Sequence, residues 1–164
     1  MRIGIPAEIR PGETRVAATP ETIKKYVAAG HEVVVQSGAG IASSITDDAY
    51  QAAGAVLTDA AGALSADLVL KVRAPDASER TLMRKDSVLV GMLNPYDADN
   101  NAAMAAAGFS AFALEAAPRI TRAQSMDVLS SQANIAGYKA VMLAANTYQR
   151  SEEHTLNSSH GYIS

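Results

Sequence analysis

Two cations, an amide and a carboxylate lie close together in one short segment, and their side chains are well suited to binding a ligand. Arg119, Arg122, Gln124 and Asp127 fall within nine residues of an otherwise apolar part of the chain. A guanidinium, an amide and a carboxylate together can hold a neutral amide or a dipolar ring such as nicotinamide. The same residue types also suit a helix start that faces water, and the residues alone leave both interpretations open.

The spacing of these residues predicts that they begin a long helix. Thr121 and Gln124 have the spacing of a capping box, in which each side chain satisfies a backbone amide of the first turn. A polar stripe then recurs at helical spacing along one face, formed by Gln124, Asp127, Ser131 and Asn134. A single helix is predicted from about 121 to 150, which would span roughly 40 Å.

Two more cations follow predicted strands. Arg15 shares a loop with Glu8 and Glu13 at the carboxyl edge of the first strand, where open α/β sheets bind ligands. It can clamp a carboxylate ligand, but an ion pair with Glu13 or Glu8 is the interpretation that the spacing favours. Lys71 ends an apolar strand. Its side chain faces either a cleft, where it could bind an anion, or solvent, where it simply caps the end of the strand. The second interpretation is favoured.

A glycine-rich segment imitates a dinucleotide-binding loop. Gly38 and Gly40 follow a strand, and Asp59 lies 19 residues after Gly40, as in the Rossmann fingerprint. However, Ser43 stands where the fingerprint has Gly or Ala, and the next helix begins only near Thr46. Its N-terminus is therefore not on the glycines, as pyrophosphate binding requires, and we interpret this segment as a glycine turn.

The remaining pattern alternates strands and helices with short loops. Apolar, β-branched segments predict strands at 2–6, 31–36, 55–57, 67–72, 87–92 and 109–114. Cap and turn residues predict helices that begin at Thr19-Pro20, span 46–54 and span 97–108. This alternation predicts a Rossmann-like or flavodoxin-like α/β fold, with a mostly parallel sheet and helices on both faces.

Composition excludes several classes of protein. Of the 164 residues, 48% are hydrophobic and 19% are charged, as in ordinary globular domains. The net charge of −3 gives no sign of a nucleic-acid partner. The chain has no cysteine, which excludes disulfides and thiolate metal sites, and we predict no metal site. No apolar run approaches the roughly 20 residues of a membrane helix.

The last segment, "SEEHTLNSSHGYIS" (151–164), has no apolar periodicity. Disorder explains this pattern, but the letters also resemble a translated sequencing-library adapter. We therefore expect a non-native or disordered tail, with the natural chain continuing elsewhere after Arg150. His154 and His160 are accordingly given no role as metal ligands or catalytic bases.

Three segments carry a resemblance to a known superfamily. "GIPAEIRPGETRVAATPE" (4–21) and "DLVLKVRAP" (67–75) resemble the alanine dehydrogenases and the NAD(H)-binding subunit of proton-translocating nicotinamide nucleotide transhydrogenase. "PRITRAQSMDVLSSQANIAGYKAV" (118–141) resembles the transhydrogenase branch. The resemblance implies an N-terminal domain over 1–123 and a long inter-domain helix over 124–150. It also implies a second, NAD-binding Rossmann domain that this chain lacks.

The resemblance also implies roles for individual residues. Arg119, Gln124, Asp127 and Ser130 would hold the nicotinamide end of NAD(H). Hydride would then pass directly to an NADP held by a separate domain. Such a reaction needs positioning rather than an acid or a base, so no catalytic residue is expected.

Arg15 and Lys71 match the residues that contact the keto acid in alanine dehydrogenases. Those enzymes place a catalytic histidine after the strand that here ends near Leu93, whereas this chain has Asn94-Pro95-Tyr96. Without that proton donor, Arg15 and Lys71 are interpreted as an inherited anion site that has lost its substrate.

Partners and location are likewise implied by the resemblance. It implies membrane and NADP-binding domains or subunits as partners, and a homodimer. The location would be cytoplasmic and peripheral to the inner (plasma) membrane, through those partner subunits. The chain alone is expected to be inactive and to bind NADH feebly. Two alternatives stay open, namely an alanine dehydrogenase-like amino-acid dehydrogenase and a truncated fragment without catalytic function.

Overall fold

The structure is a computed structural model that describes residues 1–118 and 120–148. It divides into two compact units, of which the first comprises Met1–Pro118 and the second begins at Arg119.

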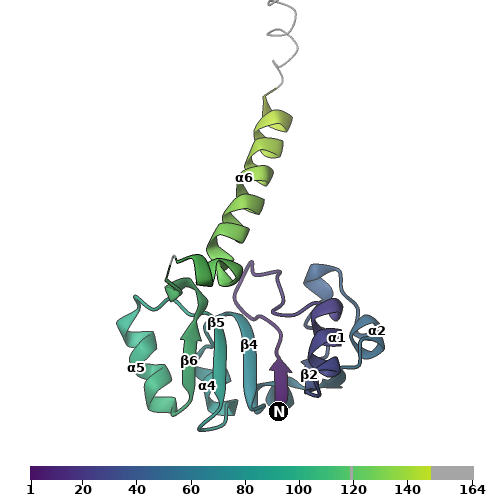
Figure 1. The fold of residues 1–164 in the computed structure, drawn as a ribbon, viewed down its shortest axis with the longest axis vertical. Coiled ribbons are helices and arrows are strands. Elements are labelled where there is room, and N and C mark those ends of the chain that lie inside the picture. Colours follow the sequence, from purple (N-terminus) through teal and green to yellow (C-terminus); the bar gives the residue numbers. More distant parts are fainter. Residues whose placement is uncertain (119, 149–164) are drawn as a thin grey trace, which may run out of the picture. The chain divides into compact units, whose positions relative to one another are not determined.

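A six-stranded parallel sheet forms the centre of the first unit. Its strands are β1 (Arg2–Ile5), β2 (Glu32–Gln36), β3 (Val56–Thr58), β4 (Leu68–Arg73), β5 (Val88–Met92) and β6 (Ser110–Ala113). They pair in the order β3-β2-β1-β4-β5-β6, and every pair is parallel. Figure 1 shows β1, β4, β5 and β6 pointing the same way. This order is that of the Rossmann fold, and the predicted fold class is confirmed.

Helices cover both faces of this sheet. They are α1 (Pro20–Ala28), α2 (Asp47–Ala52), α3 (Ala60–Leu64), α4 (Ala77–Leu82) and α5 (Ala98–Ala107), with two short 3-10 helices, η1 (Ile41–Ser43) and η2 (Leu114–Ala116). Val33 in β2 packs in one core cluster with Ile23 of α1 and Tyr50 of α2. The next residue, Val34, packs in a second cluster with Leu64 of α3. Neighbouring residues of a strand point to opposite faces, so the two clusters lie on opposite sides of the sheet.

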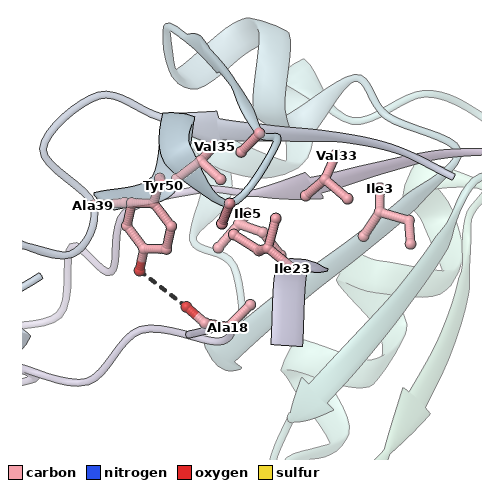
Figure 2. Close-up of a cluster of buried hydrophobic side chains, with 10 residues drawn as sticks. Ile3, Ile5, Ala18, Ile23, Val33, Val35, Ala39 and Tyr50 are labelled. Atoms are coloured by element: carbon pink, nitrogen blue, oxygen red, sulfur yellow. Dashed lines mark hydrogen bonds between the residues drawn. The ribbon is translucent and has the colours of Figure 1, made fainter. Parts of the chain in front are cut away.

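Among the buried side chains of the first cluster, only that of Tyr50 carries a polar atom, and this atom has a hydrogen-bond partner. Tyr50 is fully buried, and its hydroxyl donates a hydrogen bond of 2.9 Å to the carbonyl of Ala18 (Figure 2). A buried hydroxyl without a partner costs roughly 1–3 kcal/mol. This bond therefore lets Tyr50 fill the space between α2 and the sheet and also ties down the loop that precedes α1.

Local capping explains where the predicted helices begin and end. Thr19 caps α1 through the amide of Thr22, with Pro20 in the first turn, and Thr46 caps α2. Asp97 caps α5, and Gly108 ends it with φ of 82°. At these positions the sequence-based prediction is confirmed.

Two short helices were missed by the prediction. Asp59 caps α3 by accepting from the amide of Gly62 at 2.7 Å. Asp76 and Glu79 form a complete capping box at the start of α4. Both helices are too short to show an apolar period, and only their cap residues mark them in the sequence.

The glycine segment after β2 is held by internal partners. Gly38 has φ of 80°, and its amide donates to Asp47 Oδ1 at 2.9 Å. A Cβ at Gly40 would lie 2.7 Å from the Tyr50 ring, so Gly40 serves close packing. Asp59, the apparent fingerprint acid, is the cap of α3. The arrangement is that of a glycine turn.

The second unit corrects the prediction of one long helix from 121. Residues Thr121–Met126 form the 3-10 helix η3, and α6 (Val128–Thr147) follows, running through Gly137. Asp127 is the cap of α6, whereas Thr121 makes no capping bond. Aspartate is a better cap than threonine, and the cap lies six residues later than predicted, so the helix begins nearly two turns later. The predicted polar stripe is wrong for Gln124 and Asp127, because both precede α6.

No helix in the described part of the chain is long and apolar enough to cross a membrane. The described residues also contain no group of three His, Cys, Asp or Glu side chains that could hold a metal ion. The expected tail, 151–164, lies outside the described residues.

Candidate functional site

A pocket of about 430 Å³ lies at the carboxyl edge of the sheet. Its walls come from the loops that follow β1, β4, β5 and β6 and from the first turns of α4 and α5. The strand order reverses between β1 and β4. Parallel α/β sheets bind their ligands outside the carboxyl ends of the strands at such a reversal, so topology alone makes this pocket the candidate site of the first unit.

A buried cluster of three charges forms the floor of the pocket. The Lys71 ammonium lies 2.5 Å from Glu79 Oε1 and 3.7 Å from Glu8 Oε2. The side chains of Lys71, Glu8 and Glu79 are only 1%, 2% and 7% exposed. Lys71 therefore faces the cleft rather than solvent, but two carboxylates of the chain itself already neutralise its charge.

Glu8 joins the carboxyl ends of β1 and β4. Its Oε1 accepts from the amide of Val72 at 2.6 Å, and its Oε2 accepts from the amide of Arg73 at 3.2 Å. These amides lie where β4 shifts its register against β5. Burial raises the pKa of Glu8 above its usual range, although the Lys71 ammonium and the two amides act in the opposite direction.

Arg15 belongs to a neighbouring ion-pair network and does not line the pocket. Its Nε and Nη2 donate to the two oxygens of Glu13 at 2.7 and 2.6 Å. Arg73 donates to Glu13 Oε2 at 2.9 Å. The hydrogen bonds from Arg15, followed by those from its backbone and from Arg73, lower the pKa of Glu13 to about 2. The structure thus contains the Glu13–Arg15 ion pair that the spacing favoured.

The loop after β5 places Asn94 at the pocket. Asn94 has φ of 54°, a left-handed conformation that asparagine tolerates better than most residues. Its backbone N–H donates to Glu115 Oε1 at 2.6 Å. The other oxygen, Glu115 Oε2, is buried and has no hydrogen-bond partner among the described residues. The side chain here is an amide, which supplies no proton at neutral pH.

The residues predicted to hold the nicotinamide lie in the second unit, and Arg119 lies outside the described residues. Gln124 is exposed in η3. Asp127 Oδ1 accepts from the amide of Ser130 at 3.0 Å, and its Oδ2 accepts from the Ser130 hydroxyl at 2.6 Å. Asp127 and Ser130 are therefore brought together as the first turn of α6, beside Gln124 in sequence.

Several polar pocket residues escaped the sequence analysis, among them Glu79, Arg80 and Asn100. Glu79 and Arg80 belong to α4, which was not predicted. The Asp76-Ala-Ser-Glu79 spacing is a capping-box signature and was the signal available for finding them. Asn100 lies in the first turn of the predicted helix α5, but nothing in its spacing marked it.

Comparison with known proteins places this architecture in a family. The family model described as alanine dehydrogenase/PNT, N-terminal domain, matches residues 4–136. An NAD(P) transhydrogenase subunit alpha of Rhodospirillum rubrum is 48% identical over 158 residues, which cover 92% of this chain and 41% of the relative.

Two solved structures are similar as well. The transhydrogenase of Sinorhizobium meliloti superposes with a TM-score of 0.88 at 49% identity, over 92% of this chain and 46% of that chain. An L-alanine dehydrogenase gives a TM-score of 0.68 at 35% identity, over 70% of this chain and 32% of that chain. The chain thus spans less than half the length of these relatives. By the family model over residues 4–136 and these identities, it belongs to the alanine dehydrogenase/PNT family, whose N-terminal domain it contains.

Proposed function

We propose that this chain is the N-terminal part of the NAD(H)-binding alpha subunit of a proton-translocating transhydrogenase. The observation that carries the proposal is the extent of the similarity. The transhydrogenase match covers 92% of the chain at 49% identity, whereas the alanine dehydrogenase match covers 70% at 35% identity. The polar segment 119–130 lies inside the family match, which runs over residues 4–136.

The chemistry of the pocket supports the same branch. Keto-acid reduction needs a proton donor beside the substrate, and the loop after β5 offers the amide of Asn94 instead of an imidazole. Lys71 is neutralised by Glu8 and Glu79. Hydride transfer between two nicotinamides needs neither a proton donor nor an anion site in this pocket.

On this proposal the segment around α6 positions the nicotinamide end of NAD(H). Gln124 is exposed and offers both an amide donor and an acceptor. Both carboxylate oxygens of Asp127 accept from Ser130, so we assign Asp127 to ordering this turn rather than to direct contact. Arg119 is proposed as a further contact to the cofactor.

The proposal extends to partners and location. A subunit of this type works with membrane and NADP-binding domains or subunits, and we propose a homodimer on the cytoplasmic side of the inner membrane. The complete assembly is an oxidoreductase that passes hydride from NADH to NADP while protons cross the membrane. The 164 residues of this chain match only 41% of the Rhodospirillum relative, and by themselves they are expected to be inactive.

The test uses a fusion of this chain to the rest of a relative's alpha subunit, assembled with the NADP-binding partner. Transfer of deuterium from 4-deuterated NADH to NADP measures the proposed reaction directly. Gln124→Leu should slow the transfer about tenfold or more through lost positioning. Gln51→Leu, the same change at an exposed glutamine of α2, should leave it within about twofold.

Two results would contradict the proposal. One is NADH oxidation that depends on pyruvate and ammonia without any deuterium transfer to NADP, which would establish the amino-acid dehydrogenase alternative. The other is an assembly that transfers no label although it binds both cofactors. In addition, the 164-residue chain alone should not bind NADH with micromolar affinity, as titration of NADH fluorescence would show.

A further inference from the structure

We propose that Arg122, with the hydroxyl of Ser125 beside it, binds a phosphate of NAD(H). The inference rests on the proposed function and adds a cofactor contact to it. The family resemblance leaves Arg122 without a role, because the residues that it assigns to the nicotinamide end of NAD(H) are others. Arg122 nevertheless belongs to the same polar segment before α6.

The geometry of η3 sets the direction of each of its side chains. A 3-10 helix has three residues per turn, so side chains three positions apart lie one above the other and neighbouring ones diverge by about 120°. Ala123 is the buried residue of η3, with an exposed fraction of 5%, and therefore marks the inward side. The two outer sides carry the exposed pairs Thr121–Gln124 and Arg122–Ser125.

A cofactor that contacts Gln124 can therefore reach Arg122 as well. The two residues are two positions apart, which separates them by about 4 Å along the axis of η3. In a nicotinamide nucleotide, a single ribose joins the ring to the first phosphate. With the ring on the side of Gln124, this phosphate can lie on the neighbouring side, where Arg122 and Ser125 offer N–H and O–H donors.

The guanidinium of Arg122 is available for such a ligand. It is exposed and forms no ion pair or side-chain hydrogen bond within residues 1–118 and 120–148. The carboxylate of Asp127, five positions later, accepts from the amide and the hydroxyl of Ser130. Four other arginines each form an ion pair, namely Arg2, Arg15, Arg73 and Arg84. The planar fork of donors that Arg122 keeps matches the geometry of a phosphate.

Arg122 is also the cation nearest to Gln124 in the described part of the second unit. Residues 120–148 carry three charged side chains, those of Arg122, Asp127 and Lys139. Lys139 lies 12 positions after Asp127, which corresponds to about 18 Å along α6. Salt at physiological strength screens exposed charges beyond about 8 Å. Within these residues, Arg122 is therefore the side chain that can offset the charge of a phosphate bound at η3.

The experiment titrates NADH into the fusion of this chain to the rest of a relative's alpha subunit, without the NADP-binding partner. NADH fluorescence gives the dissociation constant and needs no turnover. Arg122→Gln should raise this dissociation constant about tenfold, as expected for a lost charge-assisted contact. The difference should shrink as sodium chloride is raised from about 0.05 to about 0.5 M, because salt screens an exposed charge pair.

Three further variants sharpen the test. Arg122→Lys keeps a cation that can pair with phosphate, so its dissociation constant should stay within about threefold of that of the unchanged fusion. Ser125→Ala removes the second donor and should weaken NADH binding by less than Arg122→Gln does. Arg84→Gln is the matched control, because Arg84 is an exposed arginine of the first unit, and it should leave the dissociation constant within about twofold.

Three results would overturn the inference. The first is an affinity for NADH that Arg122→Gln leaves unchanged, even if this variant needs more of the NADP-binding partner for deuterium transfer. The second is equal weakening by Arg84→Gln, and the third is a loss in Arg122→Gln that does not depend on salt. The proposed function fails separately, through an assembly that binds NADH and NADP but transfers no deuterium between them.

Discussion

The Lys71→Met variant tests the buried charge cluster most directly. Lys71 lies 2.5 Å from Glu79 and 3.7 Å from Glu8, with all three side chains nearly inaccessible to solvent. Methionine fills a similar volume but removes the only cation between two carboxylates. At an effective dielectric constant of about 20, Coulomb's law gives attractions of about 7 kcal/mol to Glu79 and about 4 kcal/mol to Glu8.

The net loss of stability is smaller than these attractions, because burying the lysine also has a desolvation cost. Removing one partner of a buried ion pair costs about 3–5 kcal/mol, and that is the expected decrease in the free energy of unfolding at neutral pH. The orphaned carboxylates can relieve it by taking up protons. The loss should therefore shrink as the pH falls from 7 towards 5, and Lys71→Met combined with Glu79→Gln should recover part of the stability.

Urea unfolding followed by circular dichroism measures these free energies. Lys25→Met is the matched control, because Lys25 pairs with Glu21 at 2.8 Å on an exposed helix face. It should leave the free energy of unfolding nearly unchanged, because exposed ion pairs contribute little to stability. A Lys71→Met loss as small as that of Lys25→Met, or a loss that does not depend on pH, would refute the reasoning.

Three further predictions concern other sites. The pKa of Glu13 is about 2 in the folded chain, below its unfolded value, so the stabilisation by this carboxylate should be lost as the pH falls from about 4.5 towards 2. Allowing for solvent screening, this stabilisation amounts to about 1–2 kcal/mol. The urea midpoint of Glu13→Gln should therefore fall less on acidification than that of the unchanged chain. In Gly4→Ala, the new Cβ would lie 1.9 Å from the Ala63 carbonyl oxygen, so the free energy of unfolding in urea should fall by about 3 kcal/mol or more. Gly137→Ala is the control, because its Cβ would meet no atom within 4 Å and the change should stabilise α6 slightly. Asp127→Ala removes the cap of α6 and should cost about 1 kcal/mol, seen as lower ellipticity at 222 nm.

Local signals account for most of what could be predicted of the fold. Thr19 with Pro20, Thr46, and Asp97 with Gly108 mark helix ends through bonds that span only a few residues. The alternation of strands and helices predicts a mostly parallel sheet with helices on both faces, whereas the order of the strands was not predicted. The start of α6 was wrong because two capping signals compete within seven residues, at Thr121 and Asp127, and only the second one forms a bond.

The charges of the pocket were harder to predict, because their pairing depends on contacts between distant residues. Glu8 reaches the amide of Val72, 64 positions away in sequence. Glu79 became a partner of Lys71 only because α4 carries it there, and α4 was not predicted. The interpretation of Lys71 as a solvent-facing strand cap was therefore wrong, whereas the Glu13–Arg15 pair, two residues apart, was within reach of the sequence.

In this domain, a residue can be explained by the needs of the fold without any role in binding a substrate. The reversal of strand order between β1 and β4 favours a pocket there, and Glu8 joins the carboxyl ends of those strands by accepting from the amides of Val72 and Arg73. Its buried charge in turn requires Lys71, so this lysine is accounted for by the fold without any substrate. A chain can therefore keep the cation of an anion site while having no use for it. On the proposed function, Lys71 is an internal counter-ion, and a residue to examine for ligand binding is Gln124, which lies exposed before α6.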